Sequence, residues 1–363
     1  MMKILLSAGG TGGHLFPAIS VIEQIQEILG NSEHIEVYAV GNPQKIEARV
    51  AKERNWKFVP IPMEGFAGFG LKFFKFFFKT IQSINIIRNL IRKENIDFGI
   101  GTGAYLTYPA GIALHSEGKP FFLLESNLVP GKANRLLARR ASLFFATFEN
   151  THQYLPPSVE SKIRVYGTPI RKDLLTKVTK EEARQKLNIH PDRQTILVFG
   201  GSLGARTINQ GIYQNYSMLI ERGYQLVWQI GKNFEIEKVS NPFVKIYEFI
   251  DDMATAYASA DIVIARAGAS TIAEISALGK PAILLPYPYA TDNHQLLNAR
   301  ELESHNAAIV VLDEEANSKL VPKIIELLES PSKQEQLSKN IIKFSRPDAG
   351  FRIAKEILNF LNI

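Results

Sequence analysis

Short apolar runs rich in β-branched and aromatic residues recur along the whole chain, and longer segments with helical spacing separate them. Six runs lie in the first half, at residues 3–10, 34–41, 96–103, 120–126, 142–148 and 162–167. Six more lie in the second half, at residues 195–202, 225–231, 244–250, 261–268, 281–288 and 307–312. Strands separated by helix-length segments indicate parallel βαβ units, so we predict two doubly wound, Rossmann-like α/β domains in tandem.

The two groups of runs meet near Gly167-Thr168-Pro169, whose glycine and proline suit a linker. We predict an N-terminal domain over residues 1–163 and a C-terminal domain over residues 168–345. A last helix, over residues 346–363, is expected to pack back on the first domain. Ligands of such folds bind at the carboxyl ends of the strands, so the expected site is a deep cleft across which the two domains face each other.

Composition argues against a disulfide-rich, thiolate-metal, secreted or membrane-spanning protein. The 363 residues include no cysteine, which excludes disulfides and thiolate metal sites and fits a reducing cytoplasm. The apolar run at the N-terminus is too short for a secretory signal, so we predict a first strand there. No run reaches the roughly 18 apolar residues that a membrane-spanning helix needs.

The charge is unevenly distributed. Residues 1–170 hold 19 basic and 13 acidic residues, which accounts for the whole net charge of +6. Residues 71–93 hold six basic side chains and no acidic one. Such a segment suits anionic lipid or nucleic acid, and a solvated charged face is the plain alternative.

Two glycine-rich turns follow predicted strands in corresponding positions of the two domains. Residues 8–14 read AGGTGGH, and residues 199–206 read FGGSLGAR. Glycines let backbone N–H groups approach an anion, and the N-terminus of the next helix adds its positive end, so each turn is a candidate phosphate cradle. The first turn lacks the third glycine of a dinucleotide fingerprint, and no Gly-Lys pair precedes Ser or Thr as in a P-loop. NAD and ATP are therefore not predicted.

A third segment carries polar residues suited to a sugar nucleotide. In RAGASTIAE, Glu274 is expected one turn into a helix, where it accepts bonds from ribose hydroxyls or merely complements the helix dipole. His294 and Gln295, in DNHQ, are residue types that hydrogen-bond sugars well.

Together these segments carry a family resemblance. AGGTGGHLFPA, GTPIR, GGSLGARTIN, FIDDMATAY, RAGASTIAEI and DNHQLLNA resemble the GT-B glycosyltransferases of family 28, in the family's order and over nearly the whole chain. They are most similar to the N-acetylglucosaminyltransferases that complete the cell-wall precursor lipid II. The resemblance implies inverting transfer of GlcNAc from UDP-GlcNAc to the MurNAc C4 hydroxyl of undecaprenyl-pyrophosphoryl-MurNAc-pentapeptide, lipid I. It further implies action at the cytoplasmic face of the bacterial inner membrane, with no cofactor and no nucleic acid.

The resemblance also assigns residues to the donor. Arg171 and Ser202 would hold the diphosphate, Ile250 would present its backbone to uracil, and Glu274 and Gln295 would bind ribose and GlcNAc. The N-terminal residues implied to touch the donor are Thr11, Gly12, Gly13 and Asn127.

Four residues, Leu124, Ser126, Thr168 and Leu203, depart from the family's pattern. The family has His-Glu-Gln-Asn where this chain has Leu-Glu-Ser-Asn at residues 124–127. It has Asn in place of Thr168 and Gln in place of Leu203. Leucine makes no amide contact, which puts any donor contact through that side chain in doubt.

The chain contains no D-x-D motif and no Cys/His cluster, so we predict no metal. Helix N-terminal N–H groups, Ser202 and Arg171 must then stabilise the departing diphosphate. His14 is the leading general base, since imidazole titrates near working pH; the alternative is that it only positions the acceptor by donating to its phosphate. Glu125 is the other candidate base. Tyr105, at the end of another strand, is assigned to the acceptor pocket.

Residues 71–79 read LKFFKFFFK, which as a helix sorts into a lysine stripe and an opposite apolar face. The opposite face, expected to bury against the domain, consists of Phe74, Phe77, Phe78 and Ile81. The residues expected to contact an anionic membrane surface are Phe73, Phe76, Lys72, Lys75 and Lys79.

Three other functions remain open. One is a related GT-B transferase that acts on another lipid acceptor, and the second is a non-catalytic UDP-sugar-binding subunit. The third is a UDP-GlcNAc 2-epimerase, which shares the fold but consumes UDP-GlcNAc without an acceptor.

Overall fold

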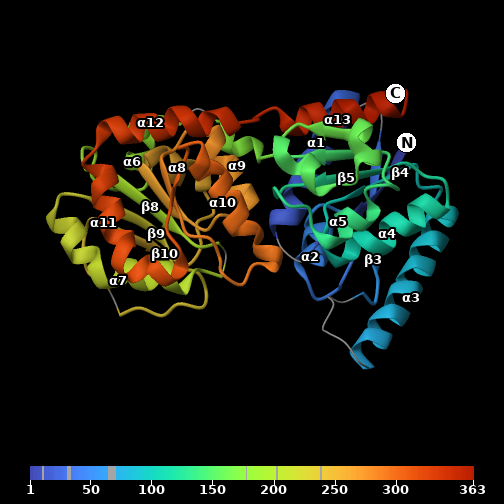
Figure 1. The fold of residues 1–363 in the computed structure, drawn as a ribbon, viewed down its shortest axis with the longest axis horizontal. Coiled ribbons are helices and arrows are strands. Elements are labelled where there is room, and N and C mark those ends of the chain that lie inside the picture. Colours follow the sequence, from blue (N-terminus) through green and yellow to red (C-terminus); the bar gives the residue numbers. More distant parts are fainter. Residues whose placement is uncertain (10–11, 31–33, 64–70, 177, 202, 238) are drawn as a thin grey trace. The chain divides into compact units, whose positions relative to one another are not determined.

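The computed structural model describes residues 1–9, 12–30, 34–63, 71–176, 178–201, 203–237 and 239–363, with the side chains of residues 71–73 excepted. They form two compact units (Figure 1). Unit 1 comprises Met1–Arg171 and Pro347–Ile363, and unit 2 comprises Lys172–Arg346. Thr11 and Ser202, two predicted donor-binding residues, lie outside the described residues.

Unit 1 is built on a seven-stranded parallel sheet in the order β3-β2-β1-β4-β5-β6-β7. Its strands are β1 Met2–Ser7, β2 Ile35–Gly41, β3 Lys57–Pro60, β4 Phe98–Gly101, β5 Phe121–Glu125, β6 Leu143–Ala146 and β7 Ile163–Val165. Its α-helices are α1 Gly12–Leu29, α2 Ile46–Glu53, α3 Leu71–Glu94, α4 Ala104–Ser116, α5 Lys132–Leu137 and α13 Ala349–Phe360. Two short 3-10 helices, η2 Glu149–Tyr154 and η3 Pro157–Lys162, precede β7.

Unit 2 repeats the plan with a six-stranded parallel sheet in the order β10-β9-β8-β11-β12-β13. Its strands are β8 Thr195–Phe199, β9 Gln225–Gln229, β10 Val244–Tyr247, β11 Ile262–Ala265, β12 Ala282–Leu284 and β13 Ile309–Val310. Its α-helices are α6 Lys180–Lys186, α7 Arg206–Glu221, α8 Met253–Ser259, α9 Ala269–Ala277, α10 His294–Ser304, α11 Ala316–Leu328 and α12 Pro331–Ile341. The 3-10 helices are η4 Lys172–Leu175, η5 Thr291–Asn293, η6 Asp313–Glu315 and η7 Ile342–Phe344.

Helices cover both faces of the unit 1 sheet, because its strands are apolar on both sides. One core packs the sheet against α1 and α13, around Leu6, Ile22 and Ile353. The other packs it against α3 and α4, around Leu123 and Leu114. This is the doubly wound arrangement that continuous apolar strands predict.

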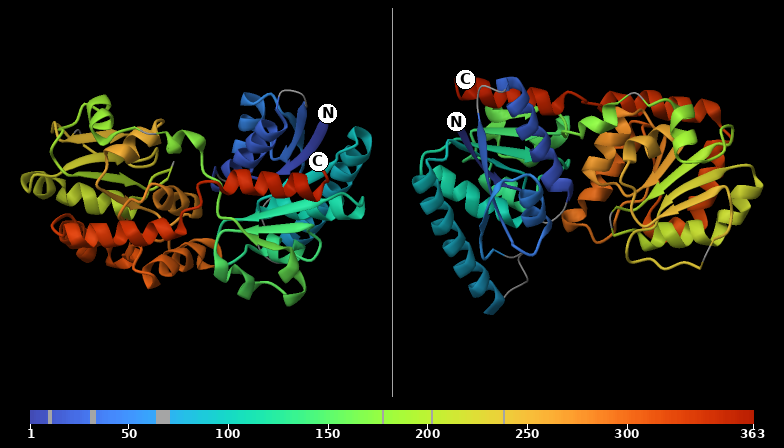
Figure 2. Two further views of the ribbon diagram at one scale, coloured as in Figure 1. Left: turned by 90° about the horizontal axis from the view of Figure 1, so that it is seen from above. Right: turned by 180° about the vertical axis from the view of Figure 1, so that it is seen from behind.

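The last helix, α13, belongs to unit 1 although the intervening chain lies in unit 2. Its buried face contacts α1, and the Phe360 ring lies edge-on to Phe122 of β5, with ring centroids 5.5 Å apart. Glu356 pairs with Arg164 of β7 at 2.9 Å. Figure 2 shows α13 lying along unit 1 beside the C-terminal label.

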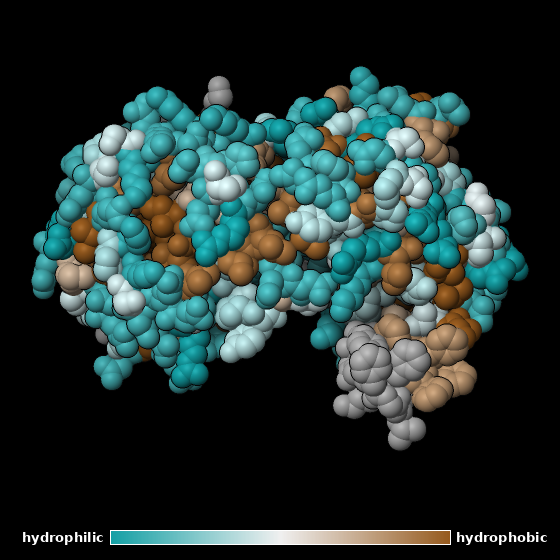
Figure 3. Space-filling model, in the orientation of Figure 1, coloured by the Kyte–Doolittle hydropathy of each residue, from teal (hydrophilic) through white to brown (hydrophobic). Residues whose placement is uncertain are grey.

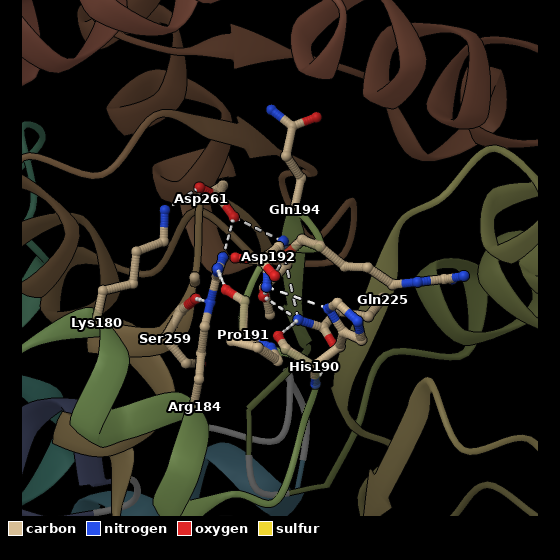
Figure 4. Close-up of polar contacts among 12 residues, drawn as sticks. Lys180, Arg184, His190, Pro191, Asp192, Gln194, Gln225, Ser259 and Asp261 are labelled. Atoms are coloured by element: carbon tan, nitrogen blue, oxygen red, sulfur yellow. Dashed lines mark hydrogen bonds and ion pairs between the residues drawn. The ribbon is translucent and has the colours of Figure 1, made fainter.

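An ion-pair cluster marks the amino end of the unit 2 sheet (Figure 4). Asp261, before β11, accepts the N–H of Thr195 at 2.6 Å and pairs with Arg184 of α6 at 2.8 Å and with Lys180. Lys280 donates to the carbonyl oxygen of Ala260 at 2.8 Å, and its burial lowers the pKa of its ammonium to about 8. Arg184 is buried, and Lys180, Asp261 and Lys280 are half-buried. The cluster lies at the end of the sheet away from the glycine turn at residues 199–206.

The apolar runs predict every strand of both sheets except β3. That strand is an edge strand of four residues that ends in Pro60, and only its two central residues are half-buried. A short, half-exposed edge strand carries too few apolar residues to stand out from a loop.

Candidate active site

His14 lies in the first turn of α1, directly after Gly12 and Gly13, the first two residues of that helix. Its Nδ1 lies 2.9 Å from the carbonyl oxygen of Thr102, in the loop after the neighbouring strand β4. A carbonyl oxygen only accepts hydrogen bonds, so Nδ1 carries the proton of the neutral ring and Nε2 carries the lone pair. The half-buried ring is therefore held in the tautomer that makes Nε2 basic.

Glu125 ends β5 and is only 4% exposed. One carboxylate oxygen accepts the backbone N–H and the side-chain amide of Asn127, at 2.9 and 3.1 Å. The other accepts the Gly131 N–H and the Asn134 side-chain amide, both at 2.9 Å. Four donors thus surround this carboxylate, and they tie residues 126–131 to the end of the strand.

The loop after β4 leads into Tyr105 through two residues with left-handed backbone. Gly103 has φ 88° and Ala104 has φ 58°. A non-glycine residue in this region costs about 1 kcal/mol, and such strain is concentrated at binding sites. The Thr107 hydroxyl anchors the turn by donating to the Ser7 carbonyl oxygen at 2.9 Å.

These loops meet at one edge of the unit 1 sheet. Strands β1, β4 and β5 are adjacent and parallel, so the segments that follow them share the carboxyl edge. The structure thereby brings together His14, Tyr105, Glu125 and Asn127. Gly12 and Gly13, the first residues of α1, belong to the same edge.

The second glycine turn joins β8 to α7 in unit 2. Gly201 and Gly204 have φ of 88° and 80°, and a Cβ on Gly204 would lie 2.0 Å from the Ile230 carbonyl oxygen. Helix α7 follows with Ala205 as its N-cap, without a side-chain capping bond or an acidic residue in the first turn. Its first N–H groups are therefore suited to an anion. Leu203, the departure from the family, is 64% exposed.

The residues assigned to the nucleoside also have defined partners. Ile250 is buried, and its N–H donates to the Gln229 side-chain oxygen at 2.8 Å, so a backbone contact with uracil would use its carbonyl oxygen. Glu274, in α9, accepts the Tyr257 hydroxyl at 2.9 Å, which orients its carboxylate. Arg171 is half-buried at the end of the first stretch of unit 1.

The residues assigned to the sugar lie at the start of α10. The Gln295 side-chain oxygen accepts the Tyr287 N–H at 3.0 Å. His294 Nδ1 lies 2.7 Å from the Thr291 carbonyl oxygen. Asp292 and Asn293 before them are left-handed, with φ of 52° and 53°, which makes a sharp turn from the loop after β12 into α10.

The predicted orientation of α3 is wrong. Phe74, Phe77 and Phe78, expected in the core, are 61%, 52% and 68% exposed, and Ile81 is 41% exposed. Phe76, expected at the membrane, is half-buried against the core of unit 1.

The reason lies in two hydroxyl residues on the inward face of α3. Thr80 and Ser83 are buried, because each hydroxyl donates to the carbonyl oxygen four residues earlier, at 2.8 and 2.7 Å. With Phe76, Ile87 and Ile91 they form the stripe that packs inward. The phenylalanines on the other side remain at the surface, and Figure 3 shows apolar side chains gathered at this end of α3.

Of the lysines on α3, Lys75 is exposed and Lys79 is half-buried. The side chains of Lys72 and Phe73 lie outside the described part of the chain. Further along the helix, Arg88 and Arg92 pair with Glu117 at 2.8 and 2.7 Å. The surface at the phenylalanine end therefore combines exposed apolar rings with lysine.

Sequence reasoning missed several polar residues that shape the site. Gln229, at the end of β9, bridges two loops, and Asn134 is one of the four donors to Glu125. Arg266, after β11, pairs with Asp313 and donates to the carbonyl oxygens of Leu285 and Pro286. For Gln229 and Arg266 the available signal was a polar residue directly at the end of an apolar strand, where the other strand residues are buried. Asn134 lies inside α5 and gave no such signal.

Comparison with known proteins identifies the family. Residues 4–145 match the glycosyltransferase family 28 N-terminal domain, and residues 195–353 match its C-terminal domain. Three similar proteins carry the name UDP-N-acetylglucosamine–N-acetylmuramyl-(pentapeptide) pyrophosphoryl-undecaprenol N-acetylglucosamine transferase.

The Thermodesulfovibrio yellowstonii protein is 37% identical to this chain over 97% of each chain. The Christiangramia forsetii protein is 34% identical over 99% of this chain and 98% of its own. The Bacteroides fragilis protein is 35% identical over 98% and 95%.

Solved structures agree with this assignment. The crystal structure of Acinetobacter baumannii MurG covers 99% of this chain with a TM-score of 0.79 and 26% identity. UDP-GlcNAc 2-epimerase from Neisseria meningitidis matches with a TM-score of 0.68 at 16% identity over 99% of this chain and all of its own, which shows a shared fold alone. The predicted GT-B class, with two doubly wound α/β units, is thereby confirmed. The chain belongs to glycosyltransferase family 28, among the UDP-GlcNAc-dependent N-acetylglucosaminyltransferases.

Proposed function

We propose that this protein transfers GlcNAc from UDP-GlcNAc to the MurNAc C4 hydroxyl of undecaprenyl-pyrophosphoryl-MurNAc-pentapeptide, with inversion, and so converts lipid I to lipid II. The observation that carries the proposal is the identity of 34–37% over nearly the full length of relatives named for this reaction. The acceptor oxygen attacks the anomeric carbon from the side opposite UDP. The bond from that carbon to the diphosphate oxygen breaks, and UDP leaves with the bonding electrons.

His14 takes the proton of the acceptor hydroxyl in this proposal. The hydrogen bond from its Nδ1 to the Thr102 carbonyl oxygen supports the role, since it directs the lone pair to Nε2. Glu125, the other candidate base, instead accepts four hydrogen bonds from its own loop. We assign it to positioning of that loop and of Asn127.

The donor binds at the carboxyl edge of the unit 2 sheet. The uncapped N-terminus of α7, Ser202 and Arg171 stabilise the charge of the departing diphosphate. Ile250 binds uracil, Glu274 the ribose, and the pair His294 and Gln295 the sugar. The resemblance also assigns Thr11, Gly12, Gly13 and Asn127 to the donor, and Tyr105 is assigned to the acceptor pocket.

A transfer assay with radiolabelled UDP-GlcNAc and a lipid I analogue tests this function. We expect labelled lipid II and one UDP released for each sugar transferred. Diacylglycerol in place of lipid I should yield no labelled lipid, which separates the proposed enzyme from a related lipid glycosyltransferase. Loss of UDP-GlcNAc without an acceptor would favour an epimerase, and binding without turnover would favour a non-catalytic subunit.

We further propose that α3 contacts the anionic cytoplasmic face of the inner membrane, where a lipid-linked acceptor would be reached. Among the described residues, no helix is long and apolar enough to cross a bilayer. In Figures 1 and 2 the N-terminal end of α3 extends past the rest of unit 1. Its exposed rings, Phe74, Phe77 and Phe78, suit insertion among acyl chains, and Lys75 suits anionic headgroups.

Vesicle binding tests the membrane contact. Partial burial of a phenylalanine is worth about 1 kcal/mol, so changing all three exposed rings to Ser should weaken binding to anionic vesicles by about 100-fold. Affinity for UDP should not change. Phe351→Ser, on α13, is the matched control, because Phe351 is 46% exposed and lies away from α3 in the sequence. Equal vesicle binding by the triple variant and the control would refute the contact.

A further inference from the structure

Gln229 is the last residue of β9, and only 4% of it is exposed. Its side-chain NH2 donates to the carbonyl oxygen of Gly201 at 2.9 Å. Its side-chain oxygen accepts the N–H of Ile250 at 2.8 Å. One buried amide therefore joins two segments that are about fifty residues apart in the chain.

The two segments are those that the proposed function assigns to different parts of UDP. Gly201 lies in the turn before α7, which would hold the diphosphate, and Ile250 would bind uracil. The bond from the Ile250 N–H to Gln229 holds in place the residue whose carbonyl oxygen would contact uracil. The Gln229 side chain can join the two segments because its amide carries both a hydrogen-bond donor and an acceptor.

The backbone of the turn before α7 also packs closely against the loop after β9. A Cβ on Gly231 would lie 2.1 Å from the Gly204 nitrogen, so the two backbones approach as only glycines allow. Asn209 of α7 donates to the Ile230 carbonyl oxygen at 2.7 Å and accepts the Trp228 indole N–H at 3.0 Å. The turn, the loop and the first part of α7 are thus connected by hydrogen bonds.

We infer that Gln229 is a positioning residue that sets the diphosphate turn at a fixed distance from the uracil-binding segment, so that both ends of UDP are recognised together. This inference rests on the proposed function. It predicts that removal of the amide raises the KM for UDP-GlcNAc and the Kd for UDP. The rate at saturating donor should change little, because Gln229 does not contact the reacting atoms.

Gln225, at the other end of the same strand, provides a matched control (Figure 4). It is also buried, and its amide accepts the His190 N–H at 2.9 Å and donates to His190, Arg193 and Thr195 oxygens at 2.7, 3.1 and 3.0 Å. Both amides donate and accept hydrogen bonds within the scaffold. They differ in that Gln225 lies at the amino end of the sheet, away from the proposed donor site.

The test compares Gln229→Met with Gln225→Met by calorimetric titration with UDP and by steady-state kinetics of the full-length protein. Loss of buried hydrogen bonds should lower the melting temperature of both variants. Only Gln229→Met should raise the Kd for UDP and the KM for UDP-GlcNAc, by about tenfold, with kcat within about threefold of wild type. Gln225→Met should bind UDP within about twofold of wild type.

A second variant keeps the test decisive if Gln229→Met does not fold. Gln229→Glu keeps an acceptor for the Ile250 N–H but puts an oxygen against the Gly201 carbonyl oxygen, so UDP affinity should again fall. Wild-type affinity in the Gln229 variants, or equal loss in the Gln225 variant, would overturn the inference. If the wild-type protein itself does not bind UDP, the proposed function fails instead.

Discussion

Substitution of Glu125 distinguishes most clearly between a residue that positions its loop and a general base. In Glu125→Gln, one carboxylate oxygen becomes an NH2 group that faces two N–H donors. Two hydrogen bonds to a charged group are lost, each worth about 1.5–3 kcal/mol. Together the two bonds contribute about 3–6 kcal/mol. Because the loop can relax, we expect the free energy of opening this loop to fall by about 3 kcal/mol, the lower value.

Hydrogen exchange with mass spectrometry measures this effect directly. A loss of about 3 kcal/mol should speed exchange of peptides covering residues 126–134 by roughly 100-fold, if the loop opens locally. Peptides from unit 2 serve as the internal control and should exchange as in wild type. The transfer rate should fall, but the acidic limb of its pH profile should remain. Abolished turnover with unchanged exchange would refute the positioning role and make Glu125 the base.

Three further outcomes follow from other parts of the structure. Gly204→Ala should weaken UDP binding and lower the melting temperature, because the new Cβ would meet a carbonyl oxygen at 2.0 Å; an unaltered protein would contradict this geometry. Lys280 has its pKa lowered to about 8, so the folded state binds fewer protons than the unfolded state above pH 8. The free energy of unfolding should therefore rise between about pH 8 and pH 10.5 by up to about 3 kcal/mol relative to Lys280→Met, as urea denaturation across pH would measure. Transfer activity should persist in EDTA, since dipoles and Arg171 are proposed to stabilise the leaving group, and loss of activity with restoration by a divalent cation would refute that proposal.

The sheets could be read from the sequence because their strands are buried on both faces. Continuous apolar runs bounded by glycine or proline are a strong signal, and β3 was missed since its edge position leaves the pattern weak. The glycine turns were predictable for a similar reason. Gly204 has a positive φ and almost no room for a side chain, so its presence in the sequence reflects a backbone requirement.

The orientation of α3 could not be read in the same way. A helical wheel assigns polar residues to solvent, yet Thr80 and Ser83 are buried because their hydroxyls bond within the helix. The four donors to Glu125 include backbone N–H groups, which no residue pattern encodes. Gln229 was overlooked because an amide near the end of a predicted strand resembles the approach to a solvated loop, and only the structure shows hydrogen bonds at both its ends.

The pH dependence of kcat/KM for the acceptor, in wild type and His14→Asn, tests the central chemical claim most directly. Asparagine can keep the N–H donor to the Thr102 carbonyl oxygen but has no basic nitrogen in place of Nε2. We predict a loss of about 10²–10⁴-fold and disappearance of the acidic limb, with UDP affinity unchanged. A variant that keeps the wild-type rate, or the wild-type acidic limb, would contradict the assignment of His14 as the base.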